Sequence, residues 1–109
     1  MNLLDKALVL FPSAIRLYQV RSLANLRLNR FQEAIQDATK IIEINPNIPD
    51  GYYSQGFVLE TVGEIESAIE AYNGGLRYDS KHDEILEALD RIERGQQGPE
   101  TSSAQVRMQ

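Results

Sequence analysis

The stretch that decides the fold is present twice in this sequence. Residues 18–35 read YQVRSLANLRLNRFQEAI, and residues 52–69, which begin 34 positions later, read YYSQGFVLETVGEIESAI. The offset pairs like with like, aligning Tyr18 with Tyr52, Ser22 with Gly56, Phe31 with Ile65, Ala34 with Ala68 and Ile35 with Ile69. A fixed period of this length indicates stacked supersecondary units, none of which buries its apolar face without a neighbour.

The same period continues toward the N-terminus. Leu8, Ile42 and Leu76 fall in line, and Pro12 lies 34 residues before Pro46. Three copies of the unit are therefore present, at least in part.

Each period contains two helices. Apolar and small residues recur at helical spacing from Ile15 to about Leu28 and again from Phe31 to Ile44. The breaks fall where the backbone can turn or where proline ends a helix, at Asn29-Arg30, Gly63-Glu64 and Asn45-Pro46-Asn47. Such short turns predict an all-α fold of antiparallel helix pairs, with about six helices. The small side chains of Ser22, Ala34, Gly56 and Ala68 are expected where two helices cross closely.

With these features the chain resembles the tetratricopeptide repeat family, whose 34-residue unit carries an early aromatic, a mid-helix small residue, an alanine opening the second helix and a closing proline. The resemblance covers residues 1 to about 92 and implies an α-α superhelix. The chain departs from the family pattern at Asn25, Gly75 and Ser80. The run from Tyr18 to Ser22, followed by Asp37-Ala38, looks like the middle repeat of co-chaperone-type domains, which implies that Arg21 pairs with Asp37.

This likeness divides the chain into a repeat domain and a tail. Residues 1–94 form the domain, with 1–12 as the second helix of a truncated repeat, 15–48 and 49–82 as repeats, and 83–94 as a capping helix with Ile85, Leu86, Leu89 and Ile92 inward. Residues 95–109, rich in Gly, Gln, Ser and Thr, are expected to be a disordered tail or a linker. The first segment carries an apolar stripe too wide for one neighbour, at Leu3, Leu4, Ala7, Leu8 and Leu10.

Composition narrows the classes of function. The net charge of −5 is uneven, because residues 1–48 hold 6 basic and 4 acidic side chains while residues 49–109 hold 5 and 12. That distribution disfavours a nucleic-acid partner, which needs a basic surface. The chain has no cysteine and one histidine, so no metal site or cofactor is expected. Neither a membrane span nor a signal peptide is indicated, and a cytoplasmic location is expected, with the nucleus as the alternative.

In the family, the first helix of each repeat lines the concave face. The resemblance therefore implies a peptide-binding groove lined by Arg16, Gln19, Leu23, Leu26, Arg27, Asp50, Tyr53, Ser54, Phe57, Glu60, Glu84 and Glu87. Tyr53 and Phe57, one helical turn apart, allow two interpretations. They could anchor a ligand, or they could lie against neighbouring helices as part of the core.

Similar domains hold the acidic C-terminal tails of heat-shock chaperones in a clamp of lysines, asparagines and an arginine. At the positions that can be compared, this chain has Val20 in place of the asparagine, Asp50 in place of the lysine and Ser54 in place of the arginine. Asp50, Glu60, Glu84 and Glu87 would also repel a carboxylate. Chaperone tails are therefore not the expected ligand, and an apolar or mildly basic segment, or a helix, fits better.

Catalytic motifs are not indicated. His82 lies between Lys81 and Asp83 at a helix junction, where helix capping or contact with solvent is expected. Glu64, Glu66 and Glu70 match neither a glycosidase pair nor a calcium loop. Gly74-Gly75 lacks the lysine and hydroxyl residue of a phosphate loop and indicates close helix packing or a weak kink.

The expected function is a non-enzymatic protein-binding module, an adaptor or scaffold segment that holds a peptide or helix of another protein. Two alternatives stay open. One is a structural element that self-associates through the N-terminal helix, and the other is a regulatory segment of a larger multidomain protein.

Overall fold

The computed structural model describes residues 2–10 and 14–95, and all the regular structure in these residues is helical. The helices are α1 (Asn2–Leu10), α2 (Ile15–Arg27), α3 (Phe31–Ile44), α4 (Asp50–Thr61), α5 (Ile65–Leu76) and α6 (Asp83–Glu93). Two helices for each period are thereby confirmed. The residues expected to form a C-terminal tail lie outside the described residues, except for Gly95.

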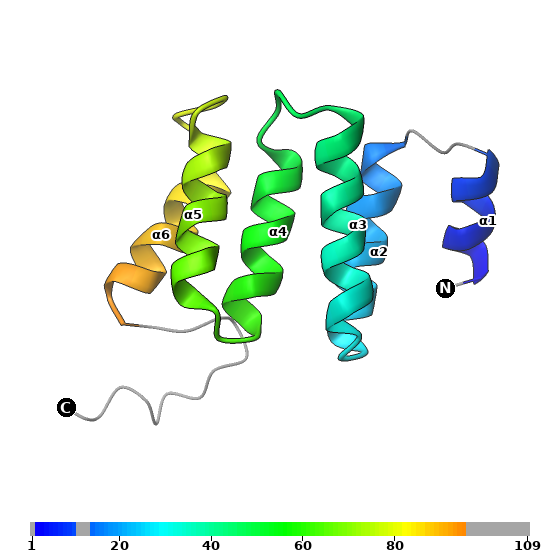
Figure 1. Cartoon of the computed structure of the whole chain (residues 1–109), viewed down its shortest axis with the longest axis horizontal. Helices are drawn as coiled ribbons and strands as arrows, with labels where there is room; N and C mark the ends of the chain where they lie inside the picture. The colour runs from blue at the N-terminus through cyan, green and yellow to red at the C-terminus, as the bar shows by residue number, and fades with distance from the viewer. Residues whose placement is uncertain (1, 11–13, 96–109) are drawn as a thin grey trace.

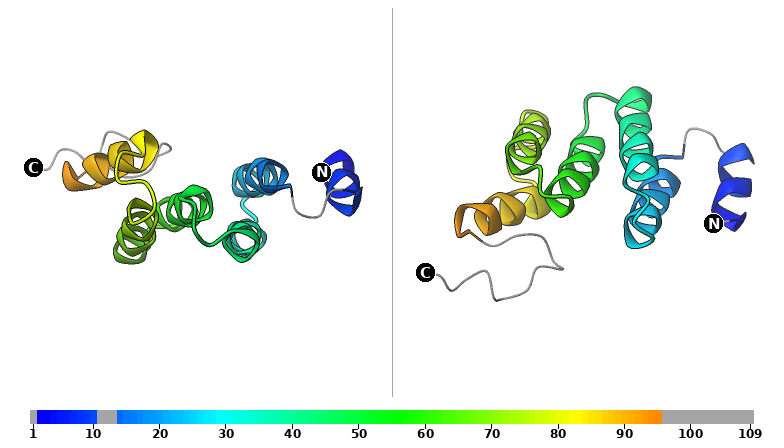
Figure 2. Two further views of the ribbon diagram at one scale, coloured as in Figure 1. Left: turned by 90° about the horizontal axis from the view of Figure 1, so that it is seen from above. Right: turned by 60° about the horizontal axis from the view of Figure 1, so that its bottom comes forward.

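The helices pack in chain order. α2 packs on α3, α3 on α4 and α4 on α5, with smaller contacts at α1 and α6 (Figure 1). Seen from above, α2, α4 and α6 lie toward one side of the row and α3 and α5 toward the other (Figure 2). This arrangement is the α-α superhelix that the resemblance to the tetratricopeptide repeat family implies.

The predicted breaks end the helices as expected. α2 ends before Asn29, whose φ is 61°, and α4 ends before Gly63, whose φ is 91°. These left-handed residues let the chain turn back, and the Arg30 and Glu64 amides then donate to the carbonyls of Asn25 and Leu59, at 2.8 and 2.9 Å.

Small residues lie where the helices cross, as predicted. Ala34 and Ala68 are fully buried, and the Ser22 hydroxyl donates to the Ala34 carbonyl at 3.0 Å. A Cβ built on Gly56 would lie 2.5 Å from the ring of Tyr72, so only glycine allows α4 and α5 to approach this closely. Gly75 has a similar role toward Ile85, whose Cδ1 would be 2.6 Å from an added Cβ.

The last helix caps the row with a narrower apolar face than the sequence analysis predicted. Ile85 and Ala88 are buried, and Leu89 and Ile92 pack partly buried against the same core. Leu86 is 42% exposed, so its expected inward orientation is wrong. Residues at spacings of three and four from Ile85 face the core, whereas Leu86, one position further, is rotated away from it.

Candidate functional site

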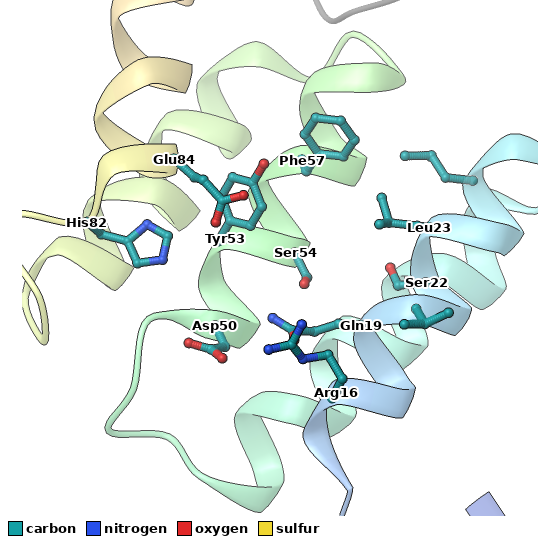
Figure 3. Close-up of a pocket in the computed structure, with 12 residues that line it drawn as sticks. Arg16, Gln19, Ser22, Leu23, Asp50, Tyr53, Ser54, Phe57, His82 and Glu84 are labelled. Carbon is teal, nitrogen blue, oxygen red and sulfur yellow. The ribbon is translucent and has the colours of Figure 1, made fainter. Parts of the chain in front are cut away.

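The hollow side of the row holds a pocket of about 490 Å³ between α2, α4 and the start of α6 (Figure 3). We call it the groove pocket. It is lined by Arg16, Gln19, Val20, Ser22, Leu23, Leu26, Asp50, Tyr53, Ser54, Phe57, His82 and Glu84. The first helices of successive repeats thus supply one continuous surface, because every second helix of the row faces the same side.

The α2 wall of the groove pocket carries exposed aliphatic side chains beside the polar Arg16, Gln19 and Ser22. Leu23 is 46% exposed and Val20 43% exposed, although both side chains are large and aliphatic. Leu26 also reaches the pocket but is buried, packing with Ala34 and Val58. Exposed aliphatic side chains on a concave surface are typical of binding sites.

Two aromatic rings of α4 form the floor. The centroids of Tyr53 and Phe57 lie 5.9 Å apart, and both residues are partly buried. Tyr53 packs against the cluster around Tyr72 and Ile85, whereas Phe57 packs against the cluster of Leu26. Each ring therefore supports the core with one side and lines the pocket with another, so the two interpretations of these rings are compatible.

The start of α6 closes the third side. His82 is the N-cap residue of α6, and its Nδ1 accepts a hydrogen bond from the Ile85 amide at 3.2 Å, which confirms the capping role. Its ring centroid also lies 5.8 Å from that of Tyr53, a contact that the sequence analysis missed. Burial raises the pKa of Tyr53, and the negative charge of Glu84 raises it further.

One residue expected in the groove is buried elsewhere. Glu60 is 2% exposed and accepts hydrogen bonds from Arg91 Nε at 2.8 Å, from Arg91 Nη2 at 2.6 Å and from the Tyr72 hydroxyl at 2.8 Å. The expectation that Glu60 lines the groove and repels a ligand is wrong, because its charge is compensated inside the molecule. Arg27 and Glu87, also expected in the groove, are exposed but do not line the pocket.

The predicted ion pair of the first full repeat is present. Arg21 donates to both carboxylate oxygens of Asp37, at 2.7 and 3.1 Å, and its Nη1 donates to Asp5 of α1 at 2.8 Å. The buried Asn25 side chain donates to Asp37 Oδ2 at 3.0 Å. The departure from the family pattern at Asn25 is thus explained, since its amide helps to satisfy a buried carboxylate.

The described residues offer binding contacts in the groove pocket and little catalytic chemistry. The Ser22 hydroxyl donates to a main-chain carbonyl, and His82 Nδ1 is used in the helix cap. Among the residues with described positions, no group of three or more His, Cys, Asp or Glu side chains could hold a metal ion. Over the same residues, no helix is long and apolar enough to cross a membrane.

Comparison with known proteins agrees with this architecture. The tetratricopeptide repeat pattern matches residues 15–48 and 49–82, so the chain belongs to the tetratricopeptide repeat family and is a protein–protein interaction module. The matched units begin with α2 and α4.

Several longer proteins contain a segment that is similar to this chain. An Hsp70-Hsp90 organizing protein of Triticum aestivum is 35% identical over 73% of this chain, and the heat shock protein STI1 of Saccharomyces cerevisiae is 33% identical over 85% of it. Tetratricopeptide repeat protein 28 of Homo sapiens is 33% identical over 77%. The chain spans 14%, 17% and 3% of these relatives, respectively.

Proposed function

We propose that the groove pocket binds a segment of another protein, and that the chain acts without catalysis as an adaptor or scaffold module. The observation that carries this proposal is the row of partly exposed apolar side chains on the concave wall, Val20, Leu23 and Phe57. In the unbound chain these side chains are exposed to water. A partner that covered them would stabilise the complex by about 25 cal/mol for each Å² of apolar surface buried.

The occupant differs from the acidic tails held by co-chaperone-type domains. Asp50 and Glu84 line the pocket, and Ser54 offers no positive charge. A carboxylate entering the pocket would meet two negative side chains against one positive side chain, Arg16, so we do not expect this chain to hold the acidic tails of chaperones.

A matched pair of substitutions tests the groove. Leu23→Glu places a charge on the pocket wall, and Leu86→Glu makes the same change at a similar exposure, 42% against 46%, outside the pocket. Tyr53 and Phe57 are less suitable targets, because they also pack against the core.

Each variant would be used to capture partners, with circular dichroism confirming that both remain helical. We expect Leu86→Glu to retain the partners of the unaltered chain and Leu23→Glu to lose them. Equal capture by both variants would show that the groove is not the binding surface.

Self-association is the second candidate, and a different observation favours it. Within the described residues, Leu3, Val9 and Leu10 of α1 are 84%, 80% and 72% exposed. A second copy that packs on α1 would cover them. Light scattering of the chain with Leu3→Glu and Leu10→Glu tests this, since a dimer held by α1 would become a monomer.

A further inference from the structure

The groove pocket has an apolar end and an acidic end. Leu23 and Phe57 lie at one end, and the side chains of Asp50, His82 and Glu84 lie at the other, where Arg16 of α2 also points toward Asp50 (Figure 3). Asp50 begins α4, and Glu84 lies in the first turn of α6. Two separate helices therefore bring a carboxylate to the same part of the surface.

The acidic end keeps a net negative charge within the described part of the chain. Neither Asp50 nor Glu84 has an ion pair within 4.0 Å there. Arg16 on the α2 wall is the one lysine or arginine among the pocket residues, and it could offset at most one of the two carboxylates. Burial raises the pKa of Tyr53 most, Glu84 raises it further, Arg91 lowers it, and Glu60 and then Glu87 add smaller increases.

The ring of Tyr53 lies beside this charge. It is partly buried among Phe57, Tyr72 and His82, so its position is fixed by packing. A fixed aromatic ring next to carboxylates suits an ammonium or guanidinium group, which gains from both the ring quadrupole and the negative charges.

We propose, on the premise that the groove binds a polypeptide, that it selects a segment with a lysine or arginine at the acidic end and a large apolar side chain against Leu23 and Phe57. The basic side chain would interact with the two carboxylates. The apolar side chain would cover the exposed surface of the α2 wall.

Helix geometry sets the spacing between these two side chains. Asp50 and Phe57 are seven positions apart on α4, which at 1.5 Å per residue corresponds to about 10 Å. An extended chain covers this length in about three residues at roughly 3.3 Å each. A helical ligand would need about seven. The basic and apolar residues should therefore be three positions apart in an extended ligand or seven in a helical one.

Selection from random peptides displayed on phage, with the whole chain as bait, tests the proposal. The unaltered chain should enrich peptides in which a basic and a large apolar residue recur at one of these spacings. Asp50→Asn with Glu84→Gln should remove the preference for the basic residue. The control is Glu66→Gln with Glu70→Gln, which makes the same charge change on the exposed surface of α5.

Affinity measurements on one enriched synthetic peptide complete the test. The Asp50→Asn, Glu84→Gln variant should bind about tenfold more weakly or worse, and the control variant less than about twofold more weakly. Added salt should weaken binding to the unaltered chain more than binding to the groove variant.

The outcomes separate this proposal from groove binding itself. Peptides that depend on Leu23 but show no basic residue, or that bind the Asp50→Asn, Glu84→Gln variant equally well, would overturn the proposed selectivity and leave groove binding standing. If the unaltered chain enriches no peptide over Leu23→Glu, both proposals fail.

Discussion

At the scale of single residues, two buried carboxylates connect the helices. Asp37 of α3 is satisfied by Arg21 and Asn25 of α2, and Glu60 of α4 is satisfied by Arg91 of α6 and Tyr72 of α5. A carboxylate removed from water is tolerated only when such partners compensate it. The second network therefore holds the capping helix on the repeat before it.

Removing the side chain of Arg91 should lower the free energy of unfolding much more than removing that of an exposed arginine near the same end of α6. Arg91→Ala would leave Glu60, whose side chain is 0% exposed, without its ion pair. We expect a loss of about 3 kcal/mol in the free energy of unfolding, measured in urea. Arg94→Ala removes an ion pair with Asp90 in which both side chains are exposed. This substitution should change the free energy of unfolding by less than about 0.5 kcal/mol.

Equal losses for Arg91→Ala and Arg94→Ala would show that the buried network does not stabilise the end of the row. The comparison is matched, because both substitutions shorten an arginine near the C-terminal end of α6. They differ in the burial of the partner carboxylate, 0% exposed for Glu60 and 55% for Asp90.

The buried Tyr72 of this network should make the stability of the chain depend on pH in the alkaline range. Burial raises the pKa of Tyr72 well above its ordinary value, and the charge and hydrogen bond of Glu60 raise it further. Above the ordinary tyrosine pKa of about 10, the unfolded chain loses the proton while the folded chain keeps it, so stability falls as pH rises.

Tyr72→Phe should make that decline shallower by up to about 1.4 kcal/mol per pH unit above pH 10. Unfolding in urea at a series of pH values measures the slope. The lost hydrogen bond to Glu60 lowers the stability at neutral pH but does not change the slope there. An unchanged alkaline slope would show that Tyr72 ionises equally easily in both states.

At the scale of helices, the close approach of α4 and α5 depends on small residues such as Gly56. Gly56→Ala would force a methyl group against the ring of Tyr72, which is itself 0% exposed and cannot move aside freely. The gain in helix propensity is about 1 kcal/mol. Overpacking costs about 1 to 3 kcal/mol, so we expect a net loss of stability.

Asn73→Ala is the control for this substitution, because Asn73 is exposed in the neighbouring helix α5. At that exposed position the substitution changes only the helix propensity. The melting temperature should therefore stay the same or rise slightly. Thermal unfolding of the two variants compares them. A stabilised Gly56→Ala variant would mean that α4 and α5 do not approach each other as closely as described.

Helix boundaries could be predicted because turn chemistry and apolar spacing are local. The second helix of the first full repeat begins at Phe31 and ends at Ile44, as the apolar spacing indicates. The orientation of Glu60 depends instead on Arg91, which is 31 residues away in the sequence. No local sequence pattern predicts that ion pair. One signal was present, because Glu60 occupies the same position of the 34-residue period as the buried Leu26.

Much of the lining of the groove pocket was implied by the resemblance to the tetratricopeptide repeat family, in which the first helix of each repeat lines the concave face. The contribution of His82 could not be predicted, since it depends on how closely the start of α6 approaches Tyr53. Leu86 is exposed because Ile85, Ala88 and Leu89 already occupy the core-facing positions at helical spacing.

At the scale of the whole molecule, the charge of the groove should exclude acidic tails. We expect an acidic chaperone C-terminal peptide to show no low-micromolar binding to the unaltered chain in a calorimetric titration. Asp50→Lys should strengthen its binding, because a positive charge then replaces a negative charge in the pocket. Low-micromolar binding to the unaltered chain would contradict this expectation.

A partner is expected to bind the side of the helix row that α2, α4 and the start of α6 form. The most direct test is chemical-shift mapping of the ¹⁵N-labelled chain titrated with a peptide selected by it. We predict that the shifted amides cluster in α2, α4 and the first turn of α6, with those of the outer helices unmoved. Shifts concentrated in α3 and α5 would contradict the claim.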